Sequence, residues 1–241
     1  MKFWKTKSGY TVTRVLSGRS NVFLLSNGNN HILIDTGIKM MGSFLFRRLK
    51  RLNITRLDAL ILTHSHFDHA GNAARIKEKF NIPVIIHQSE AQNLVSGEMV
   101  PIRGTNRFSR GVVYVLGTFF KRGFKCEPCP YDIPTGDNFD LAPFGFHAFV
   151  MHTPGHTVGS VSVVVNDEIA LVGDAMFGIF SGSVFPPFAQ NPEVMLQSWA
   201  KLLETGCPVF LPSHGSANHR NLVEKDYRKR KKAWPVKQEC S

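Results

Sequence analysis

Three histidines and an aspartate lie within six consecutive positions of this chain, in the run His64-Ser65-His66-Phe67-Asp68-His69. Burying so many polar groups costs several kcal/mol unless each has a partner, and imidazoles and carboxylates are common Zn²⁺ ligands. Residues two apart in an extended segment share a face, so His64 and His66 can bind one ion. Asp68 and His69 fall where the chain turns toward a helix. We therefore expect them to face a second ion.

Four further polar residues stand just beyond apolar segments or in a tight turn. Asp35 follows residues 31–34, Asp174 follows 170–173, and His214 follows 209–213. His156 lies in the turn Thr-Pro-Gly-His-Thr at 153–157. Any one of them alone is typical of an ordinary loop residue. Their order along the chain, together with the histidine cluster, favours a shared site.

From about residue 20 to 215, these five motifs resemble those of the metallo-β-lactamase superfamily of hydrolases, in the same order. The resemblance implies an α/β (α+β) fold, a four-layer αββα sandwich of two similar halves with the site along one edge. It also implies roles for individual residues, with Asp35 bracing the site through hydrogen bonds and not binding metal. The implied ligands are His64, His66 and His156 for one ion, Asp68, His69 and His214 for the other, and Asp174 between them.

This ligand set predicts two divalent metal ions and hydrolytic chemistry. Imidazole and carboxylate ligands without thiolate favour Zn²⁺, with Fe or Mn as alternatives. Two such ions can share a bridging hydroxide, which serves as the nucleophile on a carboxylic ester, thioester or lactone. We expect Asp68 to act catalytically by orienting that hydroxide and moving a proton.

Comparison with branches of the superfamily leaves the substrate open. Asp174 argues against the true zinc β-lactamases, and His66 and the chain length argue against the flavin-linked diiron members. The glyoxalase II and lactonase branches both fit in size. The lactonase branch has a tyrosine three residues after the bridging aspartate, where this chain has Phe177.

Aromatic residues after two of the motifs predict an apolar substrate pocket. Phe177 and Phe180 follow Asp174, and Phe44 follows Asp35. Loops after ligand-bearing strands commonly line the substrate entrance, so we expect these side chains to contact an apolar part of a small-molecule substrate. Ordinary core packing or a dimer contact explains the same residues, and a homodimer stays an open alternative.

The charge of the chain supports a second hypothesis. The net charge is +11, with six lysines and arginines against one acid at 95–125 and eight against three acids after residue 216. Basic clusters bind nucleic acid, so a phosphodiesterase acting on nucleic acid or another phosphate ester is the alternative, less favoured function. A redox or binding protein on the same scaffold is a third reading. An iron-loaded protein with visible absorbance would support it.

The remaining composition predicts a cytoplasmic protein. The four cysteines among the 241 residues have no regular spacing, which favours a reducing compartment. We also find no secretory signal and no apolar run long enough to span a membrane. The pair Cys126 and Cys129 forms one C-x-x-C, which we interpret as a loop without metal or redox function.

Several elements must position these residues within a single domain, 1–241. We expect an irregular basic and aromatic insertion at about 92–130 and a basic C-terminal helix at about 217–233. A further helix should begin with Asn191 as cap and end at Gly206. The other predicted helices are 41–52 and 69–80, and the predicted strands are 10–16, 21–26, 30–35, 58–63, 82–87, 146–152, 161–165, 169–173 and 207–211.

Overall fold

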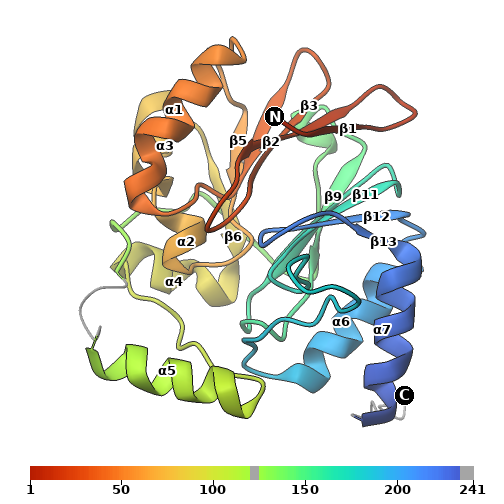
Figure 1. Ribbon diagram of the computed structural model, residues 1–241. Helices are drawn as coiled ribbons and strands as arrows, with labels where there is room; N and C mark the ends of the chain where they lie inside the picture. Colours follow the sequence, from red (N-terminus) through yellow and green to blue (C-terminus); the bar gives the residue numbers. More distant parts are fainter. Residues whose placement is uncertain (120–124, 234–241) are drawn as a thin grey trace.

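The computed structural model describes residues 1–119 and 125–233, except for the side chains of 116–119 and 233. Some residues of the insertion, the charged clusters and the cysteines considered above lie outside the described residues. They are Phe120, Lys121 and Arg122 of the insertion, and Lys237 and Cys240 near the C-terminus. Two mixed β-sheets lie between two groups of helices (Figure 1). This arrangement confirms the four-layer αββα sandwich.

The first sheet contains seven strands in the order β1 to β7. Strands β1 to β4 are antiparallel, and β4 to β7 run parallel. Their bounds are β1 Phe3–Lys5, β2 Thr11–Leu16, β3 Val22–Ser26, β4 His31–Ile34, β5 Ala59–Ile61, β6 Val84–His87 and β7 Ile133–Thr135.

The second sheet contains six strands in the order β13-β12-β11-β10-β9-β8, with β11 and β12 parallel and the other pairs antiparallel. Their bounds are β8 Asn138–Asp140, β9 Ala148–His152, β10 Val161–Val165, β11 Ile169–Gly173, β12 Val209–Pro212 and β13 Asn218–His219.

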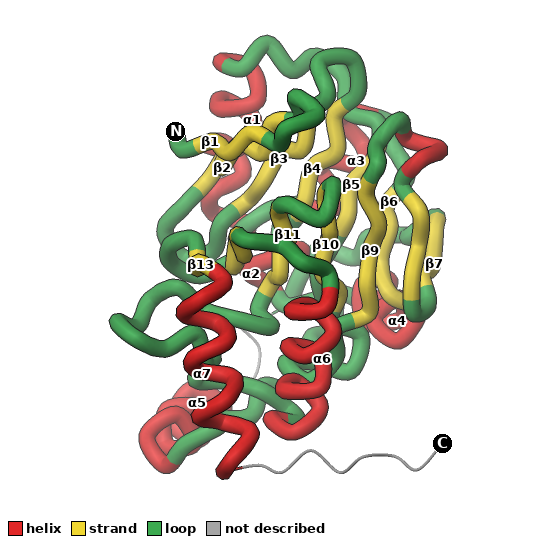
Figure 2. Tube along the Cα trace, turned by 90° about the vertical axis from the view of Figure 1, so that its right-hand side faces the viewer, coloured by secondary structure: helices red, strands yellow, loops and turns green. Residues whose placement is uncertain are grey.

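Helices cover the outer face of each sheet (Figure 2). On the first sheet lie α1 Gly42–Arg51, α2 Phe67–Ala70, α3 Ala73–Phe80 and α4 Gln88–Ser96, and on the second lie α6 Pro192–Glu204 and α7 Arg220–Ala233. Helix α5 Arg107–Phe119 lies apart from both sheets in Figures 1 and 2. Two short 3₁₀ turns span Lys39–Met41 and Ala142–Phe144. Among the described helices, none is both long and apolar enough to cross a bilayer.

Alternation along the strands builds three apolar layers. In β4, Ile32 and Ile34 face the second sheet, and Leu33 between them faces the helices. In β10, Val163 faces the first sheet and Val164 packs with α6 and α7. Because successive side chains point to opposite faces, strands that are apolar throughout must be covered on both sides. The sequence of these strands therefore specifies the layers.

The structure differs from the predicted helices and insertion in three places. The helix expected at 69–80 is two helices, because the Asn72 side chain donates to the backbone carbonyls of Thr36 and Ile38 and Gly71 packs against the 37–39 backbone. The segment 92–130, predicted to be irregular, contains the 13-residue helix α5. Its valines and two glycines have low helix propensity, which hid the helix from the sequence pattern. The basic helix begins at Arg220 because Asn218–His219 pair with β12.

Candidate metal centre

The predicted ligands gather at one edge of the sandwich, beyond the ends of strands from both sheets. His64 and His66 follow β5, and His69 lies in α2. Asp174 follows β11 and His214 follows β12, while His156 lies in the loop between β9 and β10. The two halves of the chain therefore contribute to one cluster.

The first group consists of His64, His66 and His156. Nδ1 of His66 lies 2.9 Å from Nε2 of His64 and 3.1 Å from Nε2 of His156. All three side chains are buried, and their facing nitrogens lie within 4.8 Å of one another. Three imidazoles whose nitrogens converge in this way form a suitable half-shell for one ion.

The second group consists of Asp68, His69 and His214. Nε2 of His214 lies 3.5 Å from Oδ2 of Asp68, and Nε2 of His69 lies 3.9 Å from Oδ1 of the same carboxylate. Asp68 and His214 are 15% and 14% exposed, whereas the histidines of the first group are at most 4% exposed. Access from solvent is therefore on the side of Asp68 and His214.

Asp174 lies between the two groups. Its Oδ2 is 3.5 Å from Nε2 of His156 and 3.2 Å from Nε2 of His214, and its Oδ1 is 3.5 Å from Nε2 of His69. One carboxylate thus faces histidines from both groups. This is the position that a bridging ligand requires.

The residues present fit two metal ions. Nε2 of His69 and Oδ1 of Asp174 are buried, and no described group hydrogen-bonds to them. Leaving such an atom unsatisfied costs about 1–3 kcal/mol, and a cation between them would satisfy both. Five imidazoles and two carboxylates without thiolate are also the donors expected for Zn, Fe or Mn.

Backbone carbonyls set the orientation of two imidazoles in the first group. The carbonyl of Val100 lies 3.2 Å from Nε2 of His66, and that of Phe188 lies 2.9 Å from Nδ1 of His156. Residues 103–105 pair with 187–189 through backbone hydrogen bonds of 2.9 Å and a bridge between Gly104 and Phe188. The segment predicted as an insertion therefore supports the ligand geometry.

Asp35 lies beneath the second group and contacts His69. Its Oδ2 is 2.8 Å from Nδ1 of His69, and its Oδ1 accepts the backbone N–H of Thr63 at 2.8 Å. Ser213, next to His214, also donates to it at 3.2 Å. Asp35 has a φ of +61°, an uncommon backbone conformation for a residue other than glycine. These contacts fix His69 so that its Nε2 faces the other ligands.

Electrostatics divide the site into two halves. Burial, with neighbouring imidazoles adding to it, holds the pKa of His64 and of His66 well below the ordinary range. Burial also lowers the pKa of His69, but Asp35 and Asp174 outweigh it and raise that pKa well above the ordinary value. Although burial opposes it, His214 and His69 hold the pKa of Asp174 well below its ordinary range. Burial also lowers the pKa of His156, so the three imidazoles of the first group are neutral near pH 7 and able to bind metal without losing protons.

The three predicted pocket residues do not line one described pocket. Phe177 is buried, and its ring lies 4.6 Å from that of His214. Phe180 is about half exposed, a few residues farther along the same loop. Phe44 lines a separate hollow with Arg14 and Arg48, and its ring stacks under the Arg47 guanidinium. Of these three phenylalanines, only Phe177 has a described contact with a predicted ligand.

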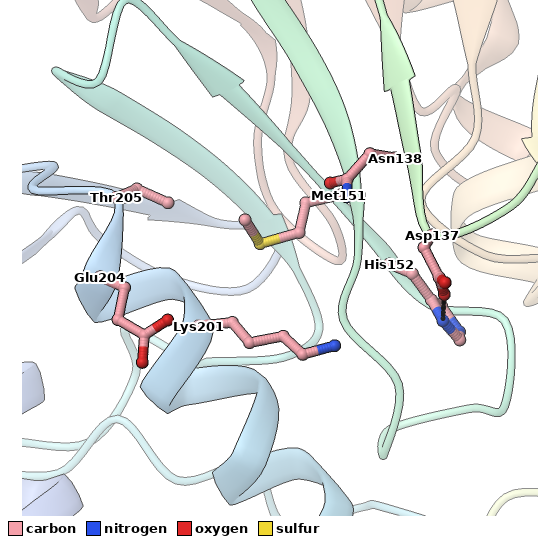
Figure 3. Close-up of a pocket in the computed structure, with 7 residues that line it drawn as sticks. All are labelled: Asp137, Asn138, Met151, His152, Lys201, Glu204 and Thr205. Atoms are coloured by element: carbon pink, nitrogen blue, oxygen red, sulfur yellow. Dashed lines mark ion pairs between the residues drawn. The ribbon is translucent and has the colours of Figure 1, made fainter. Parts of the chain in front are cut away.

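A separate hollow of about 330 Å³ lies on the outer face of the second sheet beside α6 (Figure 3). Met151 and Lys201 face it, and His152 and Asp137 pair at its edge at 3.5 Å. None of the predicted ligands lines it. It is therefore distinct from the metal centre.

Sequence reasoning missed Asn21, which holds the loop that carries His214. Its backbone N–H donates to Ser213 at 2.6 Å, and its side chain donates to the carbonyls of Pro212 and Gly215 at 2.8 and 3.0 Å. An asparagine at the start of a strand gives no distinctive signal. Its burial and the three hydrogen bonds that it donates reveal that it holds this loop.

The C-x-x-C pair packs against the first apolar layer, with Cys129 buried and Cys126 partly buried. Burial raises the pKa of both the Cys126 and the Cys129 thiols to about 11. A thiol with such a pKa is almost fully protonated near pH 7, and thiolate is the form that binds metal and exchanges disulfides. The absence of a metal or redox function for this pair stays a prediction.

The chain is similar in sequence to proteins named as metallo-hydrolases. A "probable metallo-hydrolase" of Methanocaldococcus jannaschii is 32% identical over 207 residues, covering 83% of this chain and 90% of that protein. A "probable metallo-hydrolase" of Bacillus subtilis is 29% identical over 160 residues, which cover 66% of this chain and 67% of that protein.

Solved structures share the fold. A protein solved in a di-iron-bound form has a TM-score of 0.65 and 25% identity, covering 89% of this chain and 98% of that one. An archaeal metallo-beta-lactamase superfamily protein from Sulfolobus tokodaii has a TM-score of 0.66 and 20% identity. The match covers 97% of this chain and 88% of that one. The model of the family described as the metallo-beta-lactamase superfamily matches residues 17–214, which include every predicted ligand. The chain therefore belongs to the metallo-beta-lactamase superfamily.

Proposed function

We propose that this metallo-hydrolase cleaves a carboxylic ester, thioester or lactone whose acyl or ring portion is apolar. The observation that carries the proposal is the position of Asp174 between two groups of ligands, within 3.5 Å of histidines from each. Phe177 supports the apolar portion, since its ring packs against His214 on the more exposed side of the site.

The residues of the chain have distinct tasks in this reaction. The two ions, when bound, supply Lewis acidity and a water molecule with a lowered pKa. His64, His66 and His156 would hold one ion, and Asp68, His69 and His214, on the more exposed side of the site, would hold the other. Asp68 lies on the open side, where one of its carboxylate oxygens can accept a proton from the attacking water and pass it to the leaving group. Phe177 excludes bulk water from the neighbourhood of His214.

We propose Zn²⁺ as the metal, with iron as the alternative. All seven predicted ligands offer nitrogen or carboxylate oxygen, which both metals accept. The di-iron-bound form of a structural relative supports the alternative. Elemental analysis of the purified protein identifies the metal directly. A visible absorption band would independently indicate iron, because Zn²⁺ has none.

The function is tested by turnover of a panel containing lactones, thioesters and a phosphodiester, with zinc-loaded protein and Asp174→Ala as the control. We expect turnover of acyl substrates by the wild type and loss of it in the variant. Turnover of the phosphodiester alone would overturn the proposal in favour of the phosphodiesterase alternative.

The structure gives that alternative less support than the sequence does. In α7, Arg220 and Arg228 pair with Glu224, and Arg230 pairs with the buried Asp226. Arg230 also stacks on Phe185 at 4.1 Å. Part of the basic helix is therefore engaged in intramolecular contacts and is less available for a phosphate backbone.

A further inference from the structure

A buried carboxylate outside the ligand set lies between the two loops that supply the first group of histidines. Glu90 is completely buried in the first turn of α4. Its carboxylate accepts the backbone N–H of Ser65 at 3.1 Å and the Ser65 hydroxyl, and it accepts the backbone N–H of Gly159 at 3.3 Å. A buried carboxylate is tolerated only where such donors satisfy it.

Both partners of Glu90 are close to predicted ligands in the chain. Ser65 stands between His64 and His66, and Gly159 is three residues after His156. The first loop belongs to the first sheet and the second loop joins β9 to β10 in the second sheet. Glu90 therefore connects the two halves of the sandwich at the point where the first group of ligands comes together.

The packing around Gly159 shows how closely this connection is fitted. A Cβ atom added at Gly159 would lie 2.4 Å from Cγ of Glu90 and 3.1 Å from Nδ1 of His87. No side chain fits there unless Glu90 moves. The ring of His87 is in turn stacked on that of His152, with centroids 3.9 Å apart. Glu90 is thus fixed from two sides.

We propose that Glu90 is a positioning residue for the first metal ion, which it serves by holding the His64–His66 loop and the His156 loop at a fixed separation. The proposal rests on the metal assignment in the proposed function. The second group depends on a different carboxylate, Asp35, which contacts His69 and Ser213. Loss of Glu90 should therefore weaken one metal site and leave the other unchanged.

The test compares Glu90→Gln in two backgrounds that each retain one site. His214→Ala disables the second site, and His156→Ala disables the first. Zn²⁺ affinity is measured by competition with a chromophoric chelator. Glutamine keeps the size of the side chain but presents an amide donor to N–H groups, so one contact is lost. We expect affinity about 10–100-fold weaker in the His214→Ala background and a change within about 2-fold in the His156→Ala background.

Matched variants separate positioning from general stability. Glu78→Gln removes an exposed carboxylate from α3 and should leave both affinities unchanged. Ser65→Ala removes one donor to Glu90, and we expect a smaller loss confined to the first site. It also decides the question if Glu90→Gln fails to fold. A purely structural role would lower the melting temperature in both backgrounds without changing the ratio of the two affinities.

Two outcomes would overturn different parts of the account. If Glu90→Gln leaves the Zn²⁺ affinity unchanged in the His214→Ala background, the positioning role is refuted and the proposed function is unaffected. Failure of the wild type to bind zinc at all would refute the metal assignment itself.

Discussion

At the scale of single residues, each buried charge in the site is placed where it orients a ligand. Asp35 accepts hydrogen bonds from Thr63, His69 and Ser213, and it also raises the pKa of His69. The three contacts converge on one carboxylate whose exposed fraction is 1%. A change that keeps its shape but removes its charge isolates this contribution.

We predict that Asp35→Asn weakens metal binding by about 10–100-fold, because the amide loses the charge that orients His69. The amide group would also face the backbone N–H of Thr63, which needs an acceptor. Zinc competition with a chelator measures the effect. Asp137→Asn, at a side chain that is 90% exposed, is the control. Unchanged affinity in Asp35→Asn would show that His69 does not depend on this contact.

The thiols give a second residue-scale prediction. Burial raises the pKa of Cys126 from its ordinary 9.0 to about 11, which leaves roughly 100-fold less thiolate near pH 7.5. Alkylation of Cys126 by iodoacetamide, followed by peptide mapping, should be correspondingly slow and should accelerate as the pH rises toward 11. Rapid alkylation at neutral pH would instead reveal an activated thiol and reopen a function for the C-x-x-C pair.

The sequence predicted some residues of the site and missed others for a physical reason. His64, His66, Asp68 and His69 are recognisable because ligand types at that spacing have no other common use. Asn21 and Glu90 act through hydrogen bonds to backbone groups far away in the chain. Such contacts depend on the fold, so the local sequence carries no signal for them.

At the scale of elements, helix α6 shows how a cap supports a ligand loop. The Asn191 side chain accepts the backbone N–H groups of Glu193 and Val194 at 3.1 and 3.2 Å. The backbone of Asn191 donates to Gly155, and that of Gln190 donates to His156. The cap predicted from the sequence is therefore present, and it adjoins the metal centre.

We predict that Asn191→Ala lowers stability by about 1 kcal/mol, because two N–H groups lose their acceptor. For a chain of this size, that corresponds to a melting temperature lower by about 2–4 °C. Asn191→Asp keeps an acceptor oxygen and should melt close to the wild type in the same calorimetric scan. An equal loss in both variants would show that the side-chain oxygen is not the stabilising group.

Elements were easiest to predict where burial gives a clear pattern. Strand β10, apolar except for Ser162, and the apolar strand β11 have the bounds that the sequence predicts. Strands β1, β7, β8 and β13 have two or three residues each, too few for an alternating pattern. Helix α2 ends early because Asn72 makes contacts to the 36–38 loop that only the folded chain provides.

At the scale of the whole molecule, the ligands come from both halves of the sandwich. The first sheet contributes His64, His66, Asp68 and His69, and the second contributes the rest. A ligand that binds only the folded chain stabilises it, by about 2.7 kcal/mol when its concentration is 100 times its dissociation constant. Bound metal should therefore hold the halves together.

We predict that removing metal with a chelator lowers the melting temperature by at least about 5 °C, and that adding back zinc restores it. The Asp174→Ala variant loses the carboxylate between the two groups, so its recovery should be smaller. A melting temperature indifferent to chelator would mean that no metal links the halves.

The most direct measurement of the central claim is a titration of the metal-free enzyme with Zn²⁺, followed by acyl-substrate turnover. We predict that activity rises until two ions are bound per chain, because both groups of ligands and Asp174 act together. Full activity at one ion per chain, or no acyl turnover with two ions bound, would contradict it.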